Sequence, residues 1–128
     1  MSSLVAIYNA PTATNGDYFL SLYSTNTSGG GYSARIFSSA ATSGWNYGLS
    51  VGGTAPTDWS APLSTATWYK IILKYDVTAK TASFGVFTPS YAPTNDSELS
   101  VSFPTAGGAQ TNVTSVVIRQ GSASGSAW

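Results

Sequence analysis

Residues 67–76 read Thr-Trp-Tyr-Lys-Ile-Ile-Leu-Lys-Tyr-Asp, and this stretch decides the fold class. Side chains alternate between the two faces of an extended strand. One face of this stretch is apolar and carries Tyr69, Ile71, Leu73 and Tyr75. The other face is mostly polar and carries Trp68, Lys70, Ile72, Lys74 and Asp76. The pattern predicts an antiparallel strand that covers a core on one side and meets solvent or a ligand on the other.

Similar short segments recur along the chain, each bounded by Gly, Pro, Asn or Asp residues that favour turns. No helical periodicity of useful length and no internal repeat is present. Two long loops are expected at residues 54–66 and 89–96. We therefore predict an all-β fold, an antiparallel two-sheet β-sandwich with jelly-roll topology. The other predicted strands are 4–8, 18–23, 32–37, 45–51, 81–87, 98–103 and 113–119.

Length and charge limit the classes of function. The chain has 128 residues, which predicts a single domain over 1–128 with a flexible or interface-forming tail at 121–128. Five basic and five acidic residues give a net charge of zero, so nucleic acid is not an expected partner. The same balance removes charge repulsion between copies. No apolar run is long enough to span a membrane, and no membrane insertion is expected.

Side chains that support catalysis are scarce. The sequence contains no Cys and no His, which removes thiolate chemistry, the commonest general base and the commonest transition-metal ligand. Asp96 and Glu98 would lie about 6–7 Å apart on one strand face, a separation that glycoside hydrolases use. They follow a Pro/Asn-rich loop, where a solvated strand start is the better interpretation. We predict a non-enzyme without a cofactor, and the residues do not support a Ca²⁺ site.

Aromatic residues form 13% of the chain and suggest contact with carbohydrate. Flat rings stack on the C–H faces of sugars while polar side chains bond the hydroxyls. The predicted carbohydrate-binding residues are Trp45, Asn46, Tyr47, Asp58 and Trp59. The alternative is that Trp and Tyr fill the core, as they do in many β proteins.

Two further tryptophans are candidates for an assembly interface. Trp68 lies opposite the apolar face of its strand, so we expect it to be half exposed or to face a partner. Trp128 lies at the end of the chain, where a packing anchor or an interface is a better interpretation than a sugar platform.

Several motifs resemble those of concanavalin-A-like and laminin-G-like jelly-roll modules of secreted or surface-anchored bacterial proteins. The likeness covers about residues 4–121. The motifs are Asp17–Leu20, Ala34–Phe37, Trp45–Ser50, Trp68-Tyr69-x-Ile71, Tyr75-Asp76, Ala82–Val86 and Ile118–Gly121. The resemblance implies an extracellular or cell-surface location and a non-catalytic role in adhesion or polysaccharide contact. The start Met1-Ser2-Ser3 shows no signal peptide.

The resemblance also implies an open sheet edge. Modules of this kind have a further strand after the Gly/Ser-rich turn, and residues 121–128 contain none. An edge without that strand exposes backbone N–H and C=O groups that a neighbouring copy could pair with. The alternative function is therefore a self-assembling subunit of a surface layer, filament or viral appendage, a homo-oligomer with strand exchange between copies.

Overall fold

A computed structural model describes residues 2–5, 11, 14, 16–25, 31–52, 55–95 and 110–118. Strands and connecting segments account for all of these residues. The strands are β1 (Ser2–Val5), β2 (Asp17–Ser24), β3 (Gly31–Ala40), β4 (Trp45–Ser50), β5 (Tyr69–Asp76), β6 (Thr81–Phe87) and β7 (Ser115–Ile118). Within the described ranges, no helix is long and apolar enough to cross a membrane.

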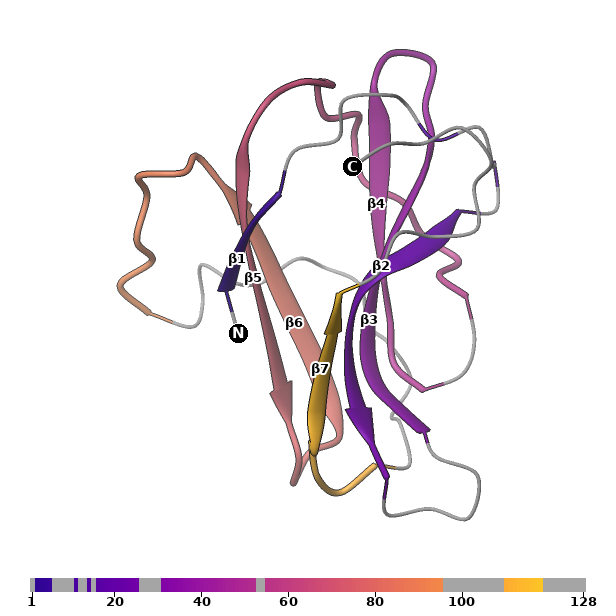
Figure 1. Cartoon of the computed structure of the whole chain (residues 1–128), viewed down its shortest axis with the longest axis vertical. Coiled ribbons are helices and arrows are strands. Elements are labelled where there is room, and N and C mark those ends of the chain that lie inside the picture. The colour runs from indigo at the N-terminus through magenta and orange to yellow at the C-terminus, as the bar shows by residue number, and fades with distance from the viewer. Residues whose placement is uncertain are drawn as a thin grey trace.

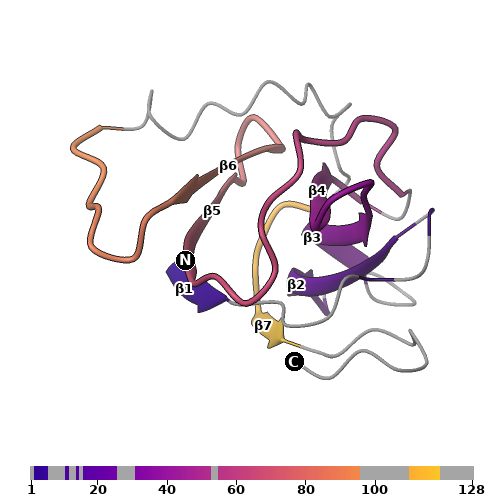
Figure 2. The same ribbon diagram turned by 90° about the horizontal axis from the view of Figure 1, so that it is seen from above.

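The strands form two sheets that face each other as layers (Figures 1 and 2). A three-stranded sheet has the order β1-β5-β6, and a four-stranded sheet has the order β4-β3-β2-β7. All pairings within the sheets are antiparallel. Three pairs of successive strands (β1 and β2, β4 and β5, β6 and β7) lie in different sheets. The predicted all-β, antiparallel two-sheet sandwich is confirmed.

The β5 pattern has the predicted orientation. Ile71 and Leu73 are fully buried, whereas Lys74 and Asp76 on the opposite face are exposed. Leu73 pairs with Phe84 of β6, whose side chain is also fully buried. Each such apolar side chain contributes about 1.5–3 kcal/mol when it leaves water. This inner face of the three-stranded sheet supplies one half of the core.

The four-stranded sheet supplies the other half of the core. Its register shifts between Tyr18 and Leu20, so that Phe19 and Leu20 are both buried in spite of being neighbours. Such a bulge adds one residue to a strand and re-aims its side chain. The buried hydrophobic cluster takes from this sheet Phe19, Leu20, Leu22, Ala34, Ile36, Trp45 and Leu49.

The outer face of the four-stranded sheet is also largely buried, and Arg35 lies there among aromatic rings. Its guanidinium carbon lies 4.4 Å from the ring centroid of Tyr32, 4.8 Å from Phe37 and 5.2 Å from Tyr18. The hydroxyls of Tyr18 and Tyr32 lie 2.7 Å apart and share a hydrogen bond. Stacking on ring faces stabilises a guanidinium away from water. Tyr18, Tyr23 and Tyr32 are half-buried on this face, and their rings pack edge to face against one another.

A short turn closes the β5–β6 hairpin, as the sequence predicts. The carboxylate of Asp76 accepts hydrogen bonds from the backbone N–H groups of Thr78 and Ala79, both at 2.8 Å. These two bonds, that of Ala79 above all, hold the pKa of Asp76 below its usual value. Lys80 has a positive φ of 57° at the end of the turn. The turn fixes the register of β5 against β6, and so determines which residues lie side by side on the outer face.

Candidate functional site

The five residues predicted to bind carbohydrate do not form one site, because β4 separates them. Its side chains alternate between the two faces of the sheet. Trp45 and Tyr47 belong to the core side. Asn46 pairs with Ser39 on the outer side, where residues 55–59 pass over the strand.

Trp45 is a core residue. It is 0% exposed, and its ring contacts Phe19, Tyr69 and Tyr47 at centroid distances of 6.2–6.4 Å. Its indole N–H donates a hydrogen bond to the carbonyl of Ser64. Such burial is incompatible with the predicted role of Trp45 as an exposed platform for sugar.

Tyr47 also packs inward. Its ring lies 5.0 Å from that of Phe84, edge to face, and bridges the two sheets. Burial raises the pKa of the Tyr47 phenol, and a hydrogen bond with the Ser60 side chain offsets part of that rise. Tyr47 therefore acts as a half-buried member of the core in this structure.

The other three predicted residues lie around the outer side of β4. The segment that follows Trp59 runs along the edge of β4, since Ser60 donates to the Tyr47 carbonyl at 2.9 Å. Trp59 is half-buried and packs against Gly16, while Asp58 is exposed. Asn46 is half-buried, and its Oδ1 is enclosed with no hydrogen-bond partner among the described residues. A ligand role for these three stays a prediction.

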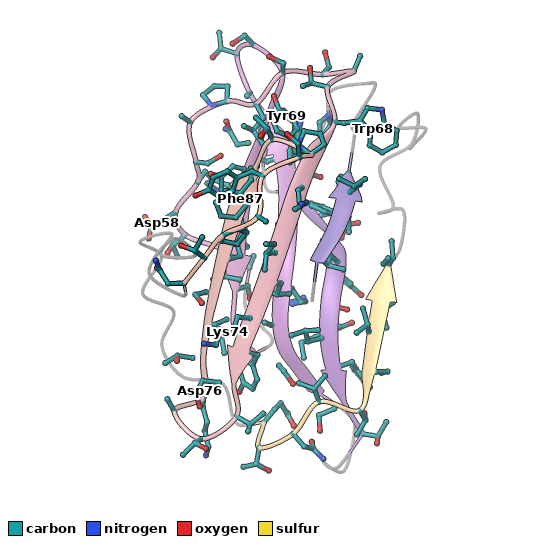
Figure 3. The ribbon with its side chains drawn as sticks, turned by 90° about the vertical axis from the view of Figure 1, so that its left-hand side faces the viewer. Asp58, Trp68, Tyr69, Lys74, Asp76 and Phe87 are labelled. Atoms are coloured by element: carbon teal, nitrogen blue, oxygen red, sulfur yellow. The ribbon has the colours of Figure 1, made fainter. Side chains whose placement is uncertain are left out.

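Exposed aromatic residues gather instead on the outer face of the three-stranded sheet. Lys70 of β5 pairs with Leu4 of β1 on one side and with Phe87 of β6 on the other. Trp68 lies two residues before Lys70 and is 52% exposed. Figure 3 faces this sheet and shows Trp68 and Phe87 on opposite sides of β5. The two aromatic side chains therefore flank Lys70.

Tyr91 completes this group from the loop after β6. Its ring stacks on that of Phe87, with centroids 4.9 Å apart and planes inclined by 21°. The ammonium group of Lys70 donates a hydrogen bond to the Tyr91 carbonyl and ties the loop to β5. Tyr91 is 42% exposed. We refer to Trp68, Lys70, Phe87 and Tyr91 as the outer aromatic patch.

The chemistry of the outer aromatic patch suits a sugar. A sugar chain that lies across β5 can reach both Trp68 and Phe87, which flank that strand (Figure 3). Ring faces contact apolar C–H groups, and an ammonium donates hydrogen bonds to oxygen atoms. β5 is paired on both sides, which gives Lys70 a rigid support.

The sequence pattern indicates that Trp68 points outward, whereas Phe87 and Tyr91 were not among the predicted site residues. The outward direction of Phe87 could have been predicted, because side chains alternate along β6 and Phe84 and Val86 point inward. Tyr91 lies in a loop, where no period of side chains indicates a direction. Its place depends on the contacts with Phe87 and Lys70.

Other candidate features add no ligand chemistry. A shallow hollow of about 250 Å³ lies where the turn at Ser43 and Gly44 meets residues 62–65, and no aromatic or charged side chain lines it. In the described ranges, no three His, Cys, Asp or Glu side chains gather as metal ligands would. The predictions for Asp96, Glu98, Trp128, strand 98–103 and the tail 121–128 lie outside the described residues.

Comparisons of the chain with protein families, curated proteins and solved structures found no match. No family model matches the chain, no curated protein is significantly similar to it, and no solved structure matches it significantly. The resemblance to concanavalin-A-like and laminin-G-like modules therefore stays a prediction. The fold and the outer aromatic patch are the observations from which function is inferred.

Proposed function

We propose that this β-sandwich is a non-catalytic binding or adhesion module that contacts carbohydrate through the outer aromatic patch. In this proposal the module works outside the cell or at the cell surface, like the modules whose motifs it resembles. The exposure of Trp68 beside the Phe87–Tyr91 stack is the observation that carries the proposal. Exposed apolar patches rimmed by polar groups commonly mark binding surfaces.

The placement of the rings supports binding rather than packing. The core already holds Trp45 and Phe84 in full burial, so the fold does not need Trp68 for its interior. The Lys70 bond to the Tyr91 carbonyl holds the loop in place before a ligand arrives. A preordered site loses less conformational entropy on binding than a mobile one.

Replacing Trp68 with alanine tests this function. We expect affinity for a bound glycan to fall at least about tenfold, which corresponds to about 1.4 kcal/mol of lost stacking and burial. Thermal unfolding should change little, because the side chain is half exposed. A glycan array with the wild-type domain identifies the ligand, and isothermal titration calorimetry then compares the variants.

Trp59→Ala is the matched control, since Trp59 lies against Gly16 at β2 of the other sheet. If Trp59→Ala abolishes binding while Trp68→Ala leaves it intact, the outer aromatic patch is not the site. The originally predicted residues Asn46, Asp58 and Trp59 would then hold the ligand.

We propose self-assembly as a second candidate function. The observation that favours it is the exposed edge strand β7. Val116 and Ile118 pair with the core residues Leu22 and Leu20, yet they are 47% and 68% exposed. Within the described part of the chain, β7 pairs only with β2 and so presents an open edge. Figure 2 shows β1 and β7 on the same side of the two layers. A strand from another copy would pair with β7 and cover its apolar side chains.

Lysine at positions 116 and 118 tests this second function. The charges would disfavour an apolar strand contact, so Val116→Lys combined with Ile118→Lys should shift any wild-type oligomer to monomer in mass photometry. Trp68→Ala should leave the oligomeric state unchanged. A wild-type domain that stays monomeric at the highest soluble concentration would contradict assembly through β7.

A further inference from the structure

We infer that the glycan bound by the outer aromatic patch is acidic, a polysaccharide bearing uronate or sulfate groups. The inference rests on the proposed function and names its ligand class. Its basis is the uneven distribution of charge in a chain whose net charge is zero.

Most positive charge of the described residues lies on the three-stranded sheet. The β5–β6 hairpin carries Lys70, Lys74 and Lys80 against the single carboxylate of Asp76. Asp17 begins β2 of the other sheet, where Arg35 is buried among aromatic rings. The remaining described carboxylate, Asp58, lies in the loop beside β4. Among the described residues, the outer aromatic patch therefore lies on the sheet that carries more positive than negative charge.

Lys70 and Lys74 extend the patch along β5. Both lie on its outer face, and four steps along the strand separate their Cα atoms by about 13 Å. Going along β5 from Trp68, a ligand meets a ring face, then the Lys70 ammonium, then Lys74. An ammonium has three donors, and the bond to the Tyr91 carbonyl uses one donor of Lys70. A linear chain with regularly spaced anionic groups fits this row.

The negative charge of Asp76 does not offset the positive charge of Lys70 next to the aromatic rings. It lies at the far end of β5 from Trp68 (Figure 3). Its carboxylate accepts the hydrogen bonds of Thr78 and Ala79 in the turn. Of the charged groups on the β5–β6 hairpin, the Lys70 ammonium is the one that is bonded to the Tyr91 loop.

An anionic membrane surface would also attract lysines beside an exposed tryptophan. Stable binding to anionic lipids usually takes clusters of about four to eight basic residues. The outer face offers two lysines with one ring on one side and a stacked pair on the other. Acidic polysaccharide is therefore the ligand class that we argue, and lipid binding is an outcome of the test.

The test uses pairs of polymers that share one sugar backbone, with one member charged and the other neutral. Polygalacturonate is compared with its methyl ester, and dextran sulfate with dextran, by isothermal titration calorimetry. We expect the wild-type domain to bind the charged member of at least one pair tenfold or more tightly. That preference should shrink as salt rises from about 50 mM to about 500 mM. Lys70→Gln combined with Lys74→Gln should remove it, while Lys80→Gln in the turn should keep it.

Each other outcome overturns the inference. Equal affinity for charged and neutral members, with loss on Trp68→Ala, would show a neutral glycan and leave the proposed function intact. A charge preference that Lys70→Gln with Lys74→Gln does not change would place the anion elsewhere. Binding to phosphatidylserine vesicles without binding to any polymer would replace glycan by lipid, and the proposed function would fall with the inference.

Discussion

Replacing Trp45 with alanine is expected to lower the free energy of unfolding of the domain strongly. The side chain is fully buried, contacts aromatic rings from both sheets, and donates a hydrogen bond to Ser64. Truncation of a buried aromatic residue costs about 3–5 kcal/mol. Domains of this size are stable by about 5–15 kcal/mol, so the loss removes a large share of the total. Urea denaturation followed by circular dichroism measures it.

The control for Trp45→Ala is the same substitution at Trp68, where the ring is half exposed on the outer face. Exposed positions usually change the free energy of unfolding by about 0.5 kcal/mol or less. If both variants lost the same stability, the inward position of Trp45 and the outward position of Trp68 would be contradicted.

Gly44→Ala is expected to cause the second large loss of stability. Gly44 has φ of 83°, in the left-handed region, which costs a residue with a side chain about 1–2 kcal/mol. A Cβ at this position would also overlap the backbone carbonyl of Leu63. That carbonyl accepts the N–H of Trp45 at 3.0 Å, so moving it breaks the contact between the 60–63 segment and β4.

The combined loss for Gly44→Ala should exceed about 2 kcal/mol, because strain and the displaced backbone act together. Thermal unfolding by differential scanning calorimetry measures it, with Ser43→Ala in the same turn as the control. A melting temperature equal to that of the wild type would show that Gly44 does not pack against Leu63.

Alternation along single strands predicted much of this structure. In β5 and β6 it identified the inward residues Ile71, Leu73 and Phe84 before any pairing was known. The same reasoning applied to β4 would have placed Trp45 in the core, since it shares a face with Leu49. The burial of Trp45 agrees with the alternative interpretation, in which aromatic residues fill the core.

Other features depend on contacts between distant segments and leave no local signal. The bulge at Phe19 turns two neighbouring residues inward, which a strict period of two does not predict. Arg35 lies in a strand, but its burial depends on rings from β2 and β3 together. Tyr91 joins the outer aromatic patch through the fold of a loop. Sequence therefore predicted the layers better than the site.

The indole N–H signals of the four tryptophans test the central claim most directly. Single Trp→Phe variants assign them in a proton–nitrogen correlation spectrum, and polygalacturonate or a neutral glycan found on the array is then titrated. The account predicts a large shift for Trp68 and little change for Trp45, which is buried in the core. A shift at Trp59 with none at Trp68 would contradict binding at the outer aromatic patch.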